Sequence, residues 1–446
     1  MNQAEDVEIV LTHDRKYKFH SGTLARNSTL LNEMLIEPNA AKLSNKAKNA
    51  GITIKWMIEL KETPTHEYPA GRLGLVDLTS SGERADFRTG LVINENGRVP
   101  TKIFDHYESI FYAFYNKEIR ICDTDMRAAL EDVMQIINIA DYLGCTNIIS
   151  KPVEVALLKH GQTLYRSIQS TPAGWARMAY DLKSECIFTE AMIHLVGNWA
   201  RNKDTSNEKL REYPQIKALV KKYYRILYQK GKTLENQVAS CYPGDMQTPS
   251  TDLPIKREVF SKDILVWMAL CFFRHWLGQR IISGKGHGGE DGGFELYQQL
   301  GAAGEAYMNK IVMNQFHAKI PMTKKAFNVL ENHLLEIKEC IKGIVDKSNI
   351  LQSNCQLDVN KFPVTYLTCT KFDREDFPWL SAAAQKTPPK VNSIKRGIRP
   401  GGNEIAKQNL EAARGQERDR ADEHYEDMDS EDESEGISAR KRVRHN

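Results

Sequence analysis

The strongest constraint on the fold is a strict alternation of side chains in the first third of the chain. Between residues 52 and 60, Ile52, Ile54, Trp56, Ile58 and Leu60 alternate with Thr53, Lys55, Met57 and Glu59. Successive side chains of a β-strand point to opposite faces, so the pattern predicts a strand with one buried face. Alternation at 7–11, a polar turn at 13–16 and a short strand at 17–19 predict a hairpin before it. A further short strand is expected at 73–78.

From about residue 100 the apolar spacing changes to three and four, which predicts helices. The first helix is expected to start after Pro100, Gly144 is expected to end the second, and a third covers 148–158. Residues 151–345 read as an all-helical region. Its later helices are expected at 214–229, 261–282, 294–316 and 323–345, with a polar linker at 200–208 and a connection at 231–256.

The C-terminal part differs in composition. Residues 346–383 hold a short aromatic segment, in which Phe377–Leu380 is expected to pack on the helices because burial of large apolar side chains is favourable. Residues 384–446 contain no Phe or Trp and many charged side chains. Such a segment buries too little surface to offset its chain entropy, so a disordered tail is predicted.

Charge and cysteine usage exclude several classes of protein. The 446 residues include 61 basic and 58 acidic side chains, a net charge of +3 that argues against binding nucleic acid through the whole chain. The 8 cysteines are scattered without a C-x-x-C pair, which argues against a zinc finger or a disulfide scaffold. The apolar run at 264–273 is too short to cross a bilayer, and the acidic N-terminus does not resemble a signal peptide. We therefore expect an intracellular protein with no membrane contact.

Residues that carry chemistry are sparse. The glycine run 284–293 lacks the G-K-[ST] ending of a phosphate-binding loop, and His287, Glu290 and Asp291 lack a second His or Cys at ligand spacing. His194 and the other helical histidines are expected to be structural or exposed. The basic face of helix 214–229 is expected to be solvated, without sequence-specific nucleic-acid contact. No enzyme activity, metal or cofactor is predicted.

Three segments, in order, carry a family resemblance. They are Asp6–Leu11 with Tyr17–Ser28, then Phe104–Ile119, then Met134–Leu143. Together they resemble a BTB/POZ domain with a long insert at about 37–99, similar to fungal BTB proteins. The resemblance implies an α+β fold over 1–150, a small sheet flanked by helices, followed by a helical extension at 151–345. His20 matches a family histidine for which we expect a structural role.

The resemblance also implies a protein-binding module that forms a homodimer. The family's dimer face maps here onto Val7, Ile9, Leu11, Leu24, Leu30 and Met34. One partner class is chromatin-associated, which would make the chain a nuclear transcription-associated regulator without its own DNA-reading domain. Asp6 fits that family's charged pocket, whereas Ser21 replaces its basic residue.

The alternative implied by the resemblance is a substrate adaptor of a cullin-type ubiquitin ligase. The residues that match its cullin contact are Ile93, Glu95 and Phe104. An enzyme with an unrecognised site remains a third class. The sequence leaves the choice between these partners open.

The tail carries a localisation signal. Arg440, Lys441, Arg442 and Arg444 form a basic cluster that fits an acidic groove of a nuclear-import receptor. Ser430 and Ser434 lie in an acidic run just before it, and their phosphorylation would add about −1.5 to −2 charges each beside the cluster. We therefore expect a nuclear protein, shared in part with the cytoplasm, whose import is masked by phosphorylation.

Overall fold

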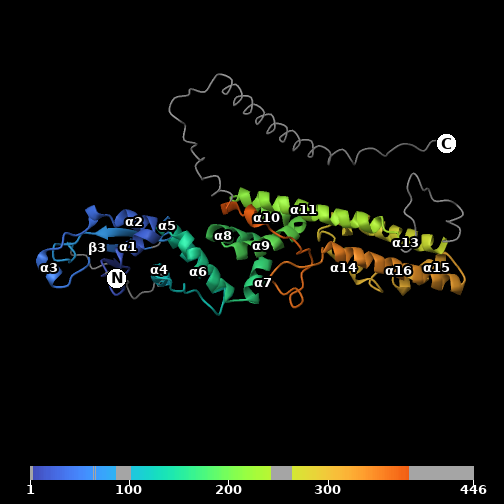
Figure 1. Cartoon of the computed structure of the whole chain (residues 1–446), viewed down its shortest axis with the longest axis horizontal. Coiled ribbons are helices and arrows are strands. Elements are labelled where there is room, and N and C mark those ends of the chain that lie inside the picture. The colour runs from blue at the N-terminus through green and yellow to red at the C-terminus, as the bar shows by residue number, and fades with distance from the viewer. Residues whose placement is uncertain (1–3, 64, 66, 87–101, 243–263, 381–446) are drawn as a thin grey trace, which may run out of the picture. The chain divides into compact units, whose positions relative to one another are not determined.

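The computed structural model describes residues 4–63, 65, 67–86, 102–242 and 264–380 (Figure 1). The chain divides into two compact units, 1–384 and 385–446, and all described residues belong to the first. Four expectations fall outside the described residues: the disordered tail, the import cluster, the two phosphorylation sites, and Ile93 with Glu95.

A four-stranded mixed sheet forms near the N-terminus. Its strands are β1 (Val7–Val10), β2 (Lys16–Phe19), β3 (Trp56–Glu62) and β4 (Arg72–Val76), in the order β2-β1-β3-β4. The predicted hairpin is confirmed, with Ile9 opposite Tyr17, and β1 also pairs in parallel with β3. Four short helical elements connect β2 to β3: α1 (Ser21–Asn27), α2 (Thr29–Met34), η1 (Glu37–Asn39) and α3 (Asn45–Asn49).

The structure corrects two expectations about this region. The strands expected at 52–60 and 73–78, within the insert 37–99 that was otherwise read as a loop, are β3 and β4 of the sheet. Strand β3 begins at Trp56 rather than Ile52, and residues 56–60 are buried on both faces. Met57 packs against Val10 and Val76 on the second face, where Glu59 is also buried and pairs with Arg84 at 2.9 Å.

Three helices follow the sheet: α4 (Lys102–Ala113), α5 (Met126–Leu143) and α6 (Thr146–Leu158). The Asp125 carboxylate caps α5 by accepting from the backbone N–H groups of Arg127 and Ala128. Gly144 ends α5 with φ of 65°, as predicted. A Cβ atom there would lie 1.8 Å from Thr29 Oγ1, so the position requires glycine on steric grounds as well. Helix α6 spans the expected domain boundary at residue 150.

The next five helices are α7 (Gln162–Ser170), α8 (Pro172–Leu182), α9 (Glu185–Gly197), α10 (Trp199–Lys209) and α11 (Pro214–Ala239). The predicted linker 200–208 is wrong, because Trp199, Ser206 and Leu210 bury one side of a helix there. Helix α11 continues ten residues past the expected end at 229, since Leu234 and Val238 extend its buried stripe. Helix α9 is buried on nearly every side.

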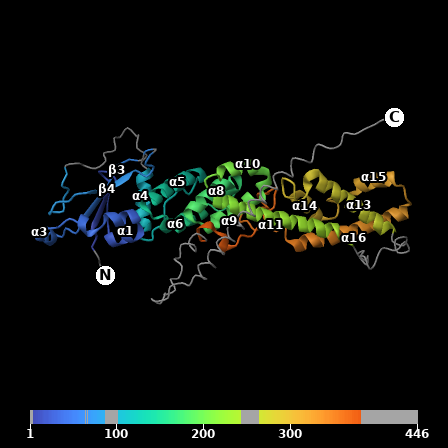
Figure 2. The ribbon, with the colours of Figure 1, turned by 90° about the horizontal axis from the view of Figure 1, so that it is seen from above.

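The last helices are α13 (Ile264–Arg280), α14 (Phe294–Ala302), α15 (Lys310–Lys319) and α16 (Lys324–Ser348). A π-helical turn, η2 (Ile281–Lys285), follows α13. The single helix expected at 294–316 is two helices, broken at Ala303 and Gly304, which both adopt positive φ. Helices α13 and α16 pack side by side (Figures 1 and 2). Among the described helices, none has both the length and the apolar character needed to cross a membrane.

Residues 350–380 form an extended segment, here called the strap, with one short 3-10 turn, η3 (Arg374–Asp376). The strap returns over α9 and α11 and buries Tyr366, Leu367 and Phe377. The expected packing of Phe377–Leu380 holds for Phe377, which is part of the main core, and for Trp379, which packs against it, whereas Leu380 is 36% exposed. One hydrophobic cluster extends from Val7 to Phe377.

Candidate functional site

The residues expected at a dimer face lie in the core. Val7, Ile9, Leu11 and Leu24 are 0% exposed. Leu30 and Met34 are half-buried and pack against the same core. Side chains without exposed surface cannot contact a second chain. The expected dimer face therefore loses the four fully buried residues, Val7, Ile9, Leu11 and Leu24. Their apolar character reflects packing within the chain.

The other residues singled out near the N-terminus also have structural roles. Phe104 is 0% exposed, which removes it from the expected cullin contact. The backbone N–H of His20 donates to the Tyr115 hydroxyl at 2.9 Å, and His20 Nδ1 lies 3.1 Å from the same oxygen. This confirms the structural role expected for His20. The Asp6 carboxylate accepts from Ser21 Oγ at 2.6 Å rather than from a basic side chain.

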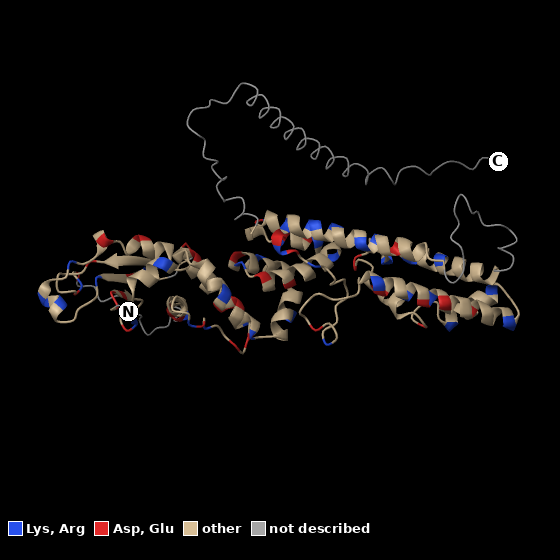
Figure 3. Cartoon of the chain, viewed as in Figure 1, with Lys and Arg blue, Asp and Glu red and all other residues tan. Residues whose placement is uncertain are grey.

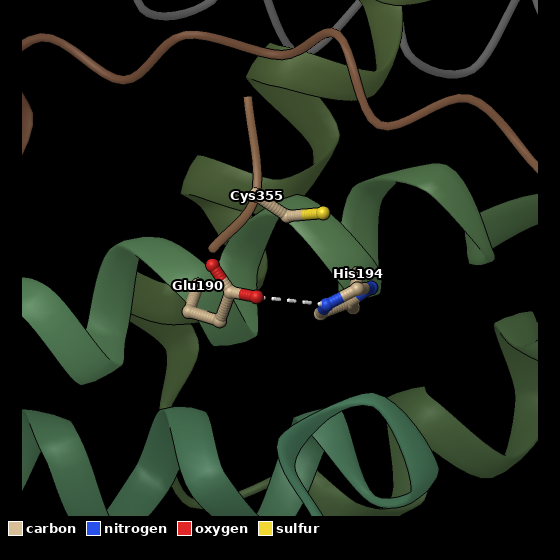
Figure 4. A group of neighbouring side chains, drawn as sticks. All are labelled: Glu190, His194 and Cys355. Atoms are coloured by element: carbon tan, nitrogen blue, oxygen red, sulfur yellow. Dashed lines mark hydrogen bonds and ion pairs between the residues drawn. The ribbon is translucent and has the colours of Figure 1, made fainter. Parts of the chain in front are cut away.

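The most concentrated group of titratable side chains joins α9 to the strap. Glu190 and His194 lie one turn apart on α9, and Cys355 of the strap lies beside them (Figure 4). Tyr366, also from the strap, contacts His194. We call these four residues the Glu190 cluster. Glu190 Oε1 lies 3.2 Å from His194 Nε2, and His194 Nδ1 lies 2.8 Å from the Tyr366 hydroxyl. Glu190 and His194 are 1% and 0% exposed.

The Glu190 carboxylate also accepts two hydrogen bonds from the strap backbone. The N–H of Gln356 donates to Oε2 at 2.7 Å, and the N–H of Leu357 donates to Oε1 at 3.1 Å. Burial raises the pKa of Tyr366, so its hydroxyl stays protonated and can donate to His194 Nδ1 or accept from it, according to the tautomer of the imidazole. Where Tyr366 donates, the His194 Nε2–H donates to Glu190, and every polar group in the chain of contacts is satisfied.

Three atoms of this cluster, from Glu190, His194 and Cys355, lie within 4.8 Å of one another, a spacing that a metal ion would fit. Zinc requires a cysteine thiolate, however, and burial raises the pKa of the Cys355 thiol. The carboxylate that would bind the metal already accepts from two backbone N–H groups. The arrangement therefore fits a structural clasp that holds the strap on α9 better than it fits a metal centre.

The end of the strap is held by ion pairs and by aromatic rings. Arg374 pairs with Glu185 of α9 at 3.0 Å, and Asp376 pairs with Lys222 of α11 at 2.6 Å. The Tyr223 hydroxyl donates to the same Asp376 carboxylate at 2.7 Å. The rings of Phe377 and Trp379 stack 5.1 Å apart, and Phe188 meets both edge-on. These contacts fix the last described residues on α9 and α11.

Asp376 is expected to make the strap sensitive to acid. Hydrogen bonds from Lys222 and then Tyr223 lower the pKa of the Asp376 carboxyl below its ordinary range. Its contribution to stability is therefore present above the unfolded pKa and is lost as the pH falls through the lower folded pKa. Tryptophan fluorescence, to which Trp379 of the strap contributes, should show a smaller acid-induced change in Asp376→Asn than in the wild type. An unchanged acid transition would contradict this role for Asp376.

A second buried carboxylate anchors the glycine run to α11. Glu235 Oε1 accepts from the His287 N–H at 2.6 Å and from the Tyr297 hydroxyl at 2.8 Å. Glu235 Oε2 lies 2.6 Å from His287 Nδ1. The glycines permit this approach, because a Cβ at Gly286 would lie 2.7 Å from Glu235 Oε1 and one at Gly231 would lie 2.8 Å from Tyr297 Oη. The glycines of the run therefore allow it to pack closely against α11, and His287 forms hydrogen bonds with Glu235.

The region of helices α13–α16 exposes several large apolar side chains. Helix α13 is rich in large apolar residues, yet only Ala269, Leu270, Phe273 and Leu277 are buried. Other rings of α13 are partly covered by neighbours, as Phe272 is by Phe316 at 4.2 Å. The large apolar side chains most exposed to solvent among the described residues include Ile282 (86%) and Ile311 (66%), and Leu335 is 48% exposed.

Comparison with known proteins gives a match over this part of the chain. A family model described as an FF domain matches residues 243–348, whose described portion holds α13–α16. No curated protein and no solved structure matches the chain. FF domains are protein-interaction modules, so the match fits a role in binding proteins.

The comparison overturns the BTB/POZ identification. The family evidence lies at 243–348 and includes no BTB/POZ match over the first 150 residues. The segments that carried the resemblance consist largely of core positions such as Ile9, Leu24 and Phe111, which any sheet packed against helices requires. The ubiquitin-ligase adaptor role and the transcription-associated role that followed from the resemblance therefore lose their support.

Proposed function

We propose that this chain binds other proteins through helices α13–α16. The observation that carries the proposal is the FF-domain match over 243–348, since FF domains are protein-interaction modules. The proposal assigns no catalytic step to the chain.

Exposed apolar side chains on the matched helices support this location. Burial of apolar surface drives most protein association, and Ile282, Ile311 and Leu335 present such surface. They lie at the end of α13, on α15 and on α16.

The test compares charged substitutions inside and outside the matched region. Full-length chains carrying Ile311→Asp or Leu335→Asp are used to capture partners from a native extract, beside Val155→Asp on α6. Val155 is 44% exposed and lies outside the match, which makes it a control for adding charge to an exposed apolar position. We expect the first two variants to lose partners that Val155→Asp keeps. Equal recovery with all three would place binding elsewhere.

A nuclear location is also proposed, on the basis of the basic cluster Arg440, Lys441, Arg442 and Arg444. Alanine at all four positions should move a fluorescent fusion of the full chain out of the nucleus, because a receptor groove would lose its charged contacts. Ser430→Ala with Ser434→Ala should increase nuclear signal if phosphates mask the cluster. Unchanged distribution of the four-alanine variant would rule out this cluster as the signal.

A further inference from the structure

Helix α11 contains many basic residues and a single acidic one, as the colours of its ribbon show (Figure 3). Lys217, Lys221, Arg225 and Lys232 follow one another at i, i+4, i+8 and i+15. At 100° per residue these positions fall within about 80° of one another around the helix, so they share one face. We call these four residues the α11 stripe. At about 1.5 Å per residue it is about 22 Å long.

The stripe is not neutralised within the described part of the chain. Three of its members are exposed and Lys217 is half-buried. The ion pairs of the described residues include Lys222 with Asp376 but none with a stripe residue. Glu235, the sole acid of α11, is 5% exposed and bound to His287 and Tyr297. Lys217, Lys221 and Arg225 therefore follow one another at about 6 Å, with Lys232 about 10 Å further along, and no exposed acid of the same helix lies among them.

We propose that the α11 stripe binds an acidic helical segment of a partner protein. A helix with glutamates or aspartates at i, i+4 and i+8 repeats its charges at the same interval of about 6 Å, so it pairs with the stripe in register. The stripe lies outside residues 243–348, so this binding surface is distinct from the one proposed on α13–α16.

The composition of the stripe favours an acidic protein over a nucleic acid. Three of the four cations are lysines, whereas arginine is the side chain whose planar fork best matches phosphate.

The test uses a fluorescein-labelled helical peptide with glutamates at the spacing of the stripe and leucines along one edge. The full-length chain is titrated and Kd is read from fluorescence anisotropy. Reversal of three charges, in Lys217→Glu/Lys221→Glu/Arg225→Glu, should weaken binding by about tenfold or more, because three attractions become repulsions. Rising salt should weaken wild-type binding, since exposed charges are screened over about 10 Å at 0.1 M.

A matched control carries the same change of charge elsewhere, in Lys203→Glu/Lys209→Glu/Lys347→Glu, all of them exposed. It should bind the peptide as the wild type does. Duplex DNA of random sequence is titrated in parallel with the peptide. Equal losses in the two triple variants would overturn the proposal, as would DNA binding that is tighter than peptide binding and is lost in the stripe variant. If Ile311→Asp lost partners from the extract but still bound the peptide, the proposal for the α11 stripe would be unaffected.

Discussion

Glu190→Ala is expected to lower the free energy of unfolding by about 3 kcal/mol or more, because it leaves several buried polar groups without partners. The carboxylate accepts from the Gln356 and Leu357 N–H groups and from His194 Nε2. Each of these groups would lose its partner at a site with almost no contact with water. The measurement is denaturant unfolding of the full chain, monitored by circular dichroism and by tryptophan fluorescence.

Two controls separate the clasp from general damage. Glu208→Ala removes an exposed carboxylate of α10 and should change stability by less than about 0.5 kcal/mol. Glu190→Gln keeps the shape and one acceptor oxygen, so its loss should fall between the two. Wild-type stability in Glu190→Ala would show that the strap is held by its other contacts alone.

Cys355→Ser distinguishes the clasp from a metal centre. Cys355 Sγ contacts Ser353 Oγ at 3.0 Å and the Leu357 carbonyl at 3.6 Å, and a hydroxyl retains both contacts. A structural clasp therefore predicts a small effect. A zinc site would lose its thiolate ligand in this variant. A large loss of stability in Cys355→Ser, together with stabilisation by added zinc of the wild type but not of the variant, would therefore favour a metal centre.

The sequence predicted local structure well wherever one residue type decides the outcome. Alternation at 7–11 and 17–19 predicted the hairpin, and Gly144 predicted the end of α5 because no other residue fits its positive φ without strain. Residues 200–208 were misassigned because a helix with a narrow buried side and a polar remainder has the composition of a linker. Its buried residues meet partners that are distant in sequence.

The Glu190 cluster was only half visible in the sequence. A glutamate and a histidine four residues apart on a helix that is otherwise apolar indicate a buried polar pair, and that signal was available. Cys355 and Tyr366 lie more than 150 residues away, and no local pattern links them to α9. The apolar residues near the N-terminus show the converse problem, because a leucine at an interface and a leucine in a core have the same pattern in one sequence.

The glycine run illustrates how the sequence of a motif can leave its structural role undetermined. Its missing G-K-[ST] ending argued against phosphate binding, and the structure places a buried carboxylate against it instead. The reason for the glycines, which is the close approach of Glu235 and Tyr297, depends on α11, about 50 residues earlier in the chain. The spacing of the glycines within the run does not indicate that contact with α11.

Glu235→Ala is the second substitution expected to have a large effect, about 2–3 kcal/mol, because it removes the acceptor of three hydrogen bonds at a buried site. Burial raises the pKa of Tyr297, so its hydroxyl remains a donor and would be left unpaired. The His287 N–H would also lose its partner, and hydrogen exchange at that amide should become faster. Unfolding and amide exchange of the full chain measure the two effects.

Tyr297→Phe is the matched control, because it removes one of the three hydrogen bonds and keeps the ring. Its expected cost is about 1 kcal/mol, with little change in exchange at His287, whose bonds to Glu235 remain. If Glu235→Ala cost no more than Tyr297→Phe, the carboxylate would not be what joins α11 to the glycine run. If exchange at His287 stayed slow in Glu235→Ala, the run would be held by the packing of its glycines rather than by the carboxylate.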